Sequence, residues 1–170
     1  EAHKSLVEQL QNRTVSRTYI ALVHGVMVSG GTVDAAMGRH PVDRKRMAVV
    51  EKGKQAITHY RVEDRYRKHS LLKVNLETGR THQIRVHMAS IAYPLLGDPV
   101  YGGRFKVPPN ASEALMSVLK NFTRQALHAQ SLKLIHPDSG QALTWSAPWP
   151  EDIKNLIEAL QLDSQQSVKM

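Results

Sequence analysis

The sequence predicts a single α+β domain with a largely antiparallel β-sheet flanked by helices. Three observations support this prediction. The 170 residues are enough for one domain with a real core. Several segments alternate apolar and polar residues as β-strands do, and most of them follow one another along the chain. Other segments, before, between and after them, space their apolar residues three and four apart, which is typical of amphipathic helices.

The first half of the chain is expected to hold one helix and three strands. Leu6 and Leu10 lie four residues apart and predict a helix over 3–12. The crowded apolar stretch YIALVHGVMV at 19–28 predicts a strand, and SGGT at 29–32 predicts a turn. The remaining segments are a basic loop at 39–46, a turn at 52–54, and two alternating strands at 56–66 and 71–76 that are expected to pair as a hairpin.

The second half begins with a break at Gly79, after which Thr81 is expected to cap a helix over 82–92. Ile84, Met88 and Ile91 would face the core from this helix. Further along we expect a tight glycine-rich loop at 97–103, a helix at 111–121, two strands at 126–135 and 142–146 joined by HPDSG, and a last helix that begins at Pro150. The domain is expected to span 1–163, followed by a polar tail over 164–170.

The positive charge of the chain is concentrated in its first half. Residues 1–85 hold 16 basic and 8 acidic residues, whereas residues 86–170 hold 7 of each. A one-sided basic field favours a polyanionic partner, most often a nucleic acid, over an acidic membrane surface.

Composition excludes several classes of protein. The chain has no cysteine, which excludes a disulfide scaffold, a cysteine-ligated zinc and a thiolate nucleophile. No apolar run approaches the roughly 20 residues of a membrane helix, and the opening stretch EAHKSLVEQLQNR lacks the pattern of a signal peptide. Phosphate-loop, dinucleotide and serine-hydrolase motifs are absent, and the nine histidines do not have zinc-protease spacing, so no metal site is expected.

Two segments carry candidate site residues, and each has an alternative explanation. ETGRTHQIRVHM at 77–88 places Arg80, His82 and Arg85 around a helix start, where backbone N–H groups favour an anion, but these residues also suit an ordinary helix surface. Tyr19 is either a core residue or a ring that stacks on a nucleobase, with Arg17 beside it for a phosphate. Four further basic residues in one loop either contact phosphates or only keep the protein soluble: Arg39, Arg44, Lys45 and Arg46.

Four segments occur in a fixed order: Arg17-Thr18-Tyr19 before an apolar strand, LETGRTHQIRVHMA at 76–89, PLLGDPVYGG at 94–103 and QALHAQSLKLIHP at 125–137. With them, the chain resembles the RluA/RluD family of bacterial RNA pseudouridine synthases over essentially its whole length. RHPVDRKRMAVV at 39–50, QAITHYRV at 55–62 and the proline-rich 107–112 are similar to the RluD class in particular.

The resemblance implies a pseudouridine synthase fold. It also implies an enzyme that isomerises uridines of 23S large-subunit ribosomal RNA without a metal or organic cofactor. In such enzymes an Asp acts on the nucleoside, a Tyr that matches Tyr19 stacks on the flipped base, and a basic residue that matches Arg85 pairs with the Asp. A fixed guanidinium keeps a neighbouring Asp ionised. The expected RNA-binding residues are Arg17, Arg39, Arg44, Lys45, Arg46, Arg80 and His82.

The chain departs from the family in one respect, because no motif like HRLDxxTSG occurs in it. None of its seven aspartates lies in that context, and Asp98 in GDPVYGG is expected to be structural. In relatives the motif precedes a segment like AHKSLVEQL, which is 2–10 here. We therefore expect the C-terminal part of a catalytic domain, inactive alone, without the S4-like RNA-binding domain of many relatives.

The resemblance further implies a cytoplasmic, monomeric bacterial protein whose partner is ribosomal RNA or a ribosomal particle. A non-catalytic RNA-binding or ribosome-assembly module is the alternative, which the missing Asp motif favours. A DNA-binding regulator would need a helix-turn-helix, and the predicted helices are separated by strands.

Overall fold

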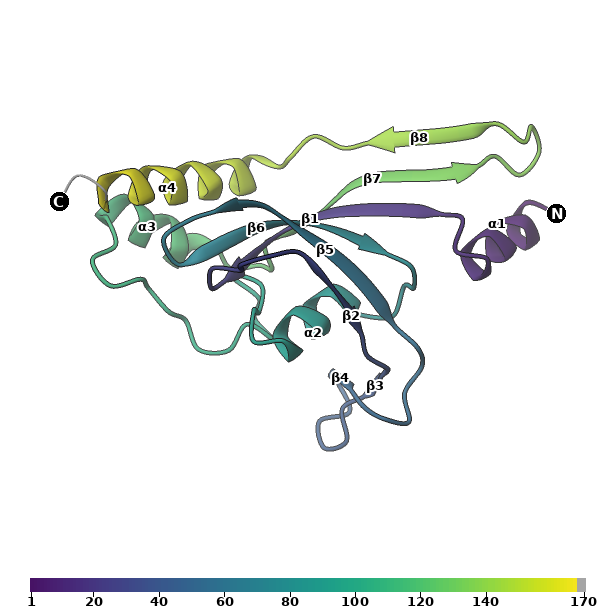
Figure 1. Ribbon diagram of the computed structural model, residues 1–170, viewed down its shortest axis with the longest axis horizontal. Helices are drawn as coiled ribbons and strands as arrows, with labels where there is room; N and C mark the ends of the chain where they lie inside the picture. Colours follow the sequence, from purple (N-terminus) through teal and green to yellow (C-terminus); the bar gives the residue numbers. More distant parts are fainter. Residues whose placement is uncertain (168–170) are drawn as a thin grey trace.

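A computed structural model describes residues 1–167, and its main feature is a six-stranded sheet with helices on both faces (Figure 1). The strand order is β2-β5-β6-β1-β7-β8, and every neighbouring pair is antiparallel. The expected α+β class is confirmed. The elements are α1 (Ala2–Gln11), β1 (Ser16–His24), β2 (Gly31–Asp34), β3 (Met37–Arg39), β4 (Met47–Val49), β5 (Ile57–Arg65), β6 (His69–Leu76), α2 (Gln83–Ser90), α3 (Glu113–Asn121), β7 (Leu127–Ile135), β8 (Ala142–Ser146) and α4 (Glu151–Ser167).

Strand β1 lies in the middle of the sheet and contributes to two cores. Its side chains alternate, so Ile20 and Leu22 face one side while Ala21 and Val23 face the other. Helices α3 and α4 cover the first face and α2 covers the second (Figure 1). Because both faces are covered, β1 reads as an almost continuous apolar run in sequence.

The predicted hairpins of β5 with β6 and of β7 with β8 are confirmed. Three short strands were missed. The expected turn at 29–32 is wrong in its second half, because β2 starts at Gly31 and pairs with β5. Strands β3 and β4 form a small two-stranded sheet on either side of the basic loop. Strands this short show no alternation in sequence, and pairing with distant partners defines them.

The expected Thr81 cap of α2 is wrong. The N-cap residue is His82, in a left-handed conformation with φ 58°, and it makes no side-chain capping bond. The buried Gln83 side chain accepts hydrogen bonds from the backbone N–H of Arg80 and the hydroxyl of Thr78, at 3.0 and 2.7 Å. A side chain within the helix thus organises the segment that leads into it.

Helix α4 continues past the expected end of the domain. The Ser164 hydroxyl donates to the carbonyl of Leu160 and accepts a hydrogen bond from the backbone N–H of Arg67. The first residues of the expected polar tail are therefore the last turns of α4, and 168–170 lie outside the described residues.

Helix α1 and the β7–β8 hairpin extend together beyond the body of the molecule (Figure 1). The Gln9 amide joins them, because its nitrogen donates to the carbonyl of Ile135 at 2.8 Å and its oxygen accepts from the N–H of Ile135 at 2.9 Å. Near α1 the start of β1 is less covered than its middle, since Ser16 is exposed and Arg17 and Tyr19 are half-buried, and the candidate site lies there.

Candidate functional site

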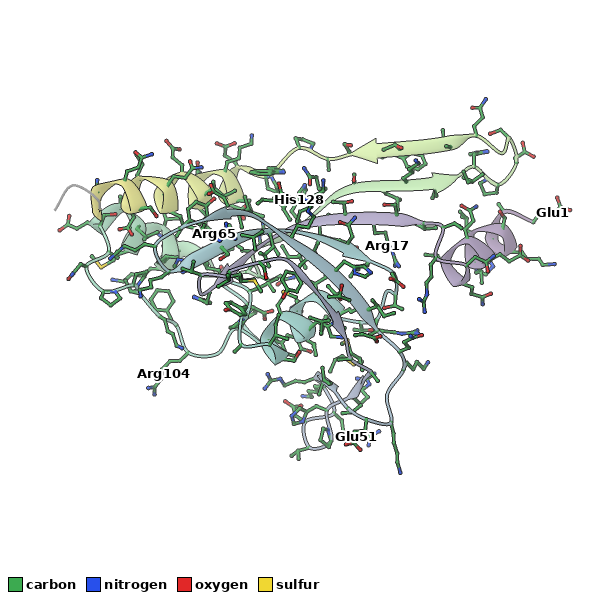
Figure 2. The ribbon with its side chains drawn as sticks, viewed as in Figure 1. Glu1, Arg17, Glu51, Arg65, Arg104 and His128 are labelled. Atoms are coloured by element: carbon green, nitrogen blue, oxygen red, sulfur yellow. The ribbon has the colours of Figure 1, made fainter. Side chains whose placement is uncertain are left out.

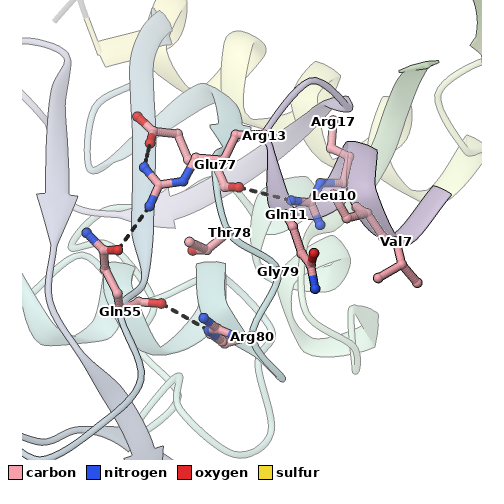
Figure 3. A pocket seen from close by; sticks show the side chains of 10 residues that line it. All are labelled: Val7, Leu10, Gln11, Arg13, Arg17, Gln55, Glu77, Thr78, Gly79 and Arg80. Atoms are coloured by element: carbon pink, nitrogen blue, oxygen red, sulfur yellow. Dashed lines mark hydrogen bonds and ion pairs between the residues drawn. The ribbon is translucent and has the colours of Figure 1, made fainter. Parts of the chain in front are cut away.

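A cleft of about 410 Å³ lies where α1, the start of β1 and the loop after β6 meet (Figure 3). Three arginines from separate segments converge on it, namely Arg13, Arg17 and Arg80. Arg17 comes from β1, and Figure 2 shows it on the half of the sheet nearest to α1. The cleft is lined by Val7, Leu10, Gln11, Arg13, Arg17, Gln55, Glu77, Thr78, Gly79 and Arg80.

Neighbouring groups fix two of these guanidinium groups. Arg13 bonds the Glu77 carboxylate and the Gln55 side-chain oxygen, and Arg80 Nε donates to the Gln55 carbonyl at 3.0 Å (Figure 3). Hydrogen bonds from His59 and then from Arg13 lower the pKa of Glu77, so this carboxylate stays ionised. The cleft nevertheless keeps an excess of positive charge.

Arg17 is held more loosely than Arg13 and Arg80. Its Nη2 donates to the carbonyl of Glu77 at 3.4 Å, and its Nε is buried without a hydrogen-bond partner among the described residues. A Cβ atom at Gly79 would lie 2.3 Å from Arg17 Nη1, so only glycine leaves room for the guanidinium here. The glycine of the GRTHQIRVHM motif thus has a steric role in placing Arg17.

Two further clefts adjoin the first one. A cleft of about 460 Å³ shares Gly79 and Arg80 with it and is also lined by Arg39, Lys52 and Lys54. A cleft of about 300 Å³ shares Arg17. The three clefts therefore adjoin one another, and we call them together the groove; its basic residues extend from the β3–β4 hairpin as far as Arg17.

The groove ends in an apolar patch that includes Leu132 and the aromatic side chains of Tyr19 and Trp145. The Tyr19 ring is half-buried, packs against the apolar core beneath α2 and also lines the cleft. Both interpretations of Tyr19 thus find support in the geometry, since a ring fixed by core packing can present its other side to a base. Trp145 is 50% exposed, and sequence analysis did not select it.

Arg85 does not line the groove; it is a buried residue of α2. Its Nε and Nη2 each donate to a carboxylate oxygen of Asp98 at 2.8 Å. The backbone N–H groups of Val100 and Tyr101 also donate to Asp98. Burial alone would raise the pKa of Asp98, but these hydrogen bonds outweigh it and lower the pKa. The pairing also raises the pKa of Arg85.

The structure places Arg17, Arg80 and Arg39 along the groove, with Arg17 in the same cleft as Tyr19, while Arg44 and Lys45 lie exposed on the β3–β4 loop. Arg46 is not free, because its Nη2 donates to the Val100 carbonyl at 2.6 Å. His82 is exposed but bonds the Tyr101 hydroxyl. Sequence analysis did not select Arg13, Lys52, Lys54 and Trp145, whose only signal was basic charge or an aromatic side chain, nor Tyr101, which lies in the GDPVYGG motif.

Within residues 1–167, no group of three or more His, Asp or Glu side chains is placed to hold a metal ion. In the same part of the chain, no helix combines the length and apolar character that crossing a membrane requires. Of the described residues, a single acid, Glu77, lines the three clefts of the groove.

Comparison with known proteins agrees with this geometry. The family model described as RNA pseudouridylate synthase matches residues 1–90, which is more than half of the chain. The chain belongs to this family. The resemblance to RNA pseudouridine synthases is thereby confirmed, and the two relatives described next confirm the likeness to the RluD class.

Two relatives within the family illustrate the similarity. Ribosomal large subunit pseudouridine synthase D of Pseudomonas aeruginosa is 58% identical over 163 residues, which is 96% of this chain and 51% of that protein. The Escherichia coli K12 protein of the same name is 54% identical over 162 residues, 95% of this chain and 50% of its own length. The chain thus spans about half the length of the curated relatives it matches.

Solved structures of the family confirm the fold. Human RNA Pseudouridylate Synthase Domain Containing 4 superposes with a TM-score of 0.69 and 24% identity, over 94% of this chain and 67% of that one. Human RNA Pseudouridylate Synthase Domain Containing 1 gives a TM-score of 0.70 at the same identity, over 98% and 69%. These likenesses concern the arrangement of strands and helices.

Proposed function

We propose that the protein containing this chain is a pseudouridine synthase that isomerises specific uridines of 23S ribosomal RNA in the bacterial cytoplasm. The observation that carries the proposal is the basic groove ending at Tyr19. Phosphates would lie along the basic part of the groove, since each Lys or Arg contact releases a counterion from the nucleic acid. An extruded uracil would stack on the exposed side of the Tyr19 ring. The names of the relatives support ribosomal RNA as the substrate.

The proposed reaction needs no oxidant, reductant or other co-reactant. The bond between uracil N1 and the sugar C1′ breaks, the base turns while it stays stacked, and C5 forms the new bond to C1′. The hydrogen on C5 leaves as a proton, and N1 gains one. Isomerisation of this kind requires a nucleophile or base next to the sugar, and a carboxylate is the group expected in this family.

That carboxylate is expected to come from outside these 170 residues. Among the residues that the structure describes, Glu77 is the only acid lining the groove, and it is already bonded to Arg13 and His59. Asp98 is buried and bonded to Arg85, with its side chain 0% exposed. The assignments of Arg85 as partner of the nucleophile and of Arg17, Arg80 and the Arg39–Arg46 loop as RNA contacts remain part of this proposal.

The decisive experiment measures tritium release from large-subunit RNA labelled with 5-tritiated uridine, because C5 loses its hydrogen only when it is joined to the sugar. The full-length protein and the 170-residue chain are assayed side by side. Release by the full-length protein alone is the expected result. Release by the short chain would mean that one of its own residues acts as the nucleophile.

A non-catalytic RNA-binding or ribosome-assembly module is the second candidate. The observation that favours it is the lack of a free carboxylate in the groove. Absence of tritium release by both proteins, together with salt-dependent binding of the same RNA, would support this candidate and overturn the enzyme proposal.

A further inference from the structure

The Tyr101 side chain connects the basic β3–β4 loop to Arg85. Its ring is 91% buried and belongs to a small apolar cluster with Met37, Ala56 and Val86. The loop lies on one side of this cluster and the N-terminal part of α2 on the other. A rigid ring at such a position transmits any displacement of one neighbour to the other, since packed side chains have few alternative arrangements.

Two guanidinium groups lie against the Tyr101 ring. The distance from the ring centroid to Arg85 Cζ is 4.9 Å, and to Arg46 Cζ it is 5.2 Å. Both lie within the roughly 6 Å of a cation–π contact. Arg46 comes from the β3–β4 loop and Arg85 from α2. The Tyr101 ring therefore contacts both a candidate RNA-binding residue and a candidate catalytic residue.

The Tyr101 hydroxyl adds a second link between the same segments. It accepts a hydrogen bond from the backbone N–H of Met47, the first residue of β4, at 3.0 Å. It also bonds Nδ1 of His82, the N-cap of α2, at 2.9 Å. The neighbouring Val100 carbonyl accepts from Arg46 at 2.6 Å. Two hydrogen bonds, from Met47 and Arg46, thus attach the loop and the start of β4 to the 98–101 segment, in addition to the contact of Arg46 with the Tyr101 ring.

The backbone of the GDPVYGG motif fixes Tyr101 relative to Asp98. The Tyr101 N–H donates to Asp98 Oδ1 at 3.0 Å, and the same carboxylate holds Arg85. A Cβ atom at Gly102 would lie 2.3 Å from the Asp98 carbonyl, so the turn closes only with glycine there. The Asp98 carboxylate therefore orients both the Arg85 guanidinium and Tyr101, whose ring packs against that guanidinium.

We propose that Tyr101 is a positioning residue that couples the β3–β4 loop to Arg85, with Arg46 as the link on the loop side. The inference rests on the proposed function. Arg46 then differs from Arg44 and Lys45, which are exposed and make phosphate contacts only. RNA bound to the loop restricts the movement of Arg46. Tyr101 packs between Arg46 and Arg85, so the Arg85 guanidinium is also held in its position for the reaction.

The test compares Arg46→Met with the matched variant Arg44→Met in the full-length protein. Single-turnover tritium release is followed as a function of RNA concentration. Arg44→Met is expected to raise the half-saturating RNA concentration and to keep the saturating rate. Arg46→Met is expected to lower the saturating rate about 10-fold, because a small misplacement of a reacting group costs rate rather than affinity. Equal behaviour of the two variants would overturn the inference.

A second measurement does not depend on activity. The Nε–H resonance of Arg85 in protein labelled with nitrogen-15 arginine reports on the Asp98 hydrogen bond and on the ring current of Tyr101. Arg46→Met and Tyr101→Phe are expected to shift this resonance, and Arg44→Met is not. An unshifted resonance in both test variants would overturn the inference. If the two test variants shift the Arg85 resonance but the wild-type protein releases no tritium, the coupling stands and the proposed function is overturned.

Discussion

Arg85 and Asp98 form a buried ion pair with two parallel hydrogen bonds, both 2.8 Å long. The two residues lie on α2 and in the following loop, and their side chains are 10% and 0% exposed. Removing one partner of such a pair leaves an uncompensated buried charge. The pair therefore contributes to the stability of the domain as well as to the orientation of Arg85.

Asp98→Asn is expected to lower the free energy of unfolding by about 3–5 kcal/mol, because Arg85 loses its counter-charge in a desolvated site. Urea unfolding at pH 7 measures this loss. The double variant Asp98→Asn, Arg85→Met serves as the control and should regain part of the stability, since it removes both charges. A single variant as stable as wild type would show that the pair is solvated.

The contribution of Asp98 is also expected to depend on pH. Its folded-state pKa lies below the ordinary value of 3.8, so the unfolded state binds the proton first as the pH falls. The stability difference between wild type and Asp98→Asn should be complete above pH 3.8 and diminish as the pH falls through the folded-state pKa. Urea unfolding of both proteins between pH 3 and pH 7 measures it, and a constant difference over this range would contradict the assignment.

His69 provides a second pH dependence of stability, in which the folded state favours a neutral side chain rather than a charged one. Burial and then the neighbouring His24 lower the pKa of this 2% exposed imidazole from 6.5 to about 4. Because the unfolded chain binds the proton first, stability should fall as the pH decreases from 6.5 towards 4, by about 2 kcal/mol at pH 5. The ring-proton NMR signals of His69 should titrate near pH 4. A midpoint above 6 would mean that the ring is solvated.

Tyr19→Ala is expected to reduce the saturating rate of tritium release about 10- to 100-fold, since base–aromatic stacking is worth roughly 1–3 kcal/mol. RNA affinity should change much less, because most of it comes from phosphate contacts along the groove. Tyr19→Phe keeps the ring and is the matched control. Equal losses of rate and affinity in Tyr19→Ala would argue against a stacking role.

Gly79→Ala is expected to move the Arg17 guanidinium, because the added Cβ would overlap Arg17 Nη1. Arg17 is flexible and can give way, so the unfolding free energy should change by no more than about 0.5–1 kcal/mol. RNA affinity should fall by as much as it does in Arg17→Met. If the effect acts through Arg17, combining the two substitutions should give no further loss. Additive losses would separate the two residues.

Charge reversal of the exposed loop residues Arg44 and Lys45 to Glu is expected to weaken RNA binding in a salt-dependent manner. The slope of log affinity against log salt should become shallower by about one unit for each lost phosphate contact. Binding isotherms between 50 and 300 mM salt, with Lys120→Glu on α3 as a control far from the groove, give the comparison. An unchanged slope would assign Arg44 and Lys45 to solubility alone.

The long elements of the fold could be predicted because local sequence defines them. Strands β5 and β6 alternate clearly over most of their length, and α4 presents Ile153, Leu156 and Leu160 on one stripe, all buried. The helix at α2 was predicted to within one residue at its start, but its cap was not, because the Gln83 side chain organises the turn before it and His82 takes a left-handed conformation. The position of the Gln83 side chain depends in turn on its tertiary hydrogen bonds to Ile57 and Thr58 of β5.

The candidate site was only partly predictable for a related reason. Tyr19 and Arg17 lie together because they are two residues apart on one strand face. The pairing of Arg85 with Asp98, and the contact of Arg46 with the Tyr101 ring, join residues that are far apart in sequence. Charge and motif suggested these residues, but only the fold shows which of them face the groove and which are buried.

The central position of β1 has a consequence for the order in which the domain assembles. β1 leaves the ribosome before both of its neighbours, because β6 begins at residue 69 and β7 at residue 127. At synthesis rates of about 5–20 residues per second, an apolar strand therefore waits for seconds without a partner. The local β5–β6 hairpin can form first and offer β6 as the template on which β1 docks, while β7 and β8 complete the sheet later.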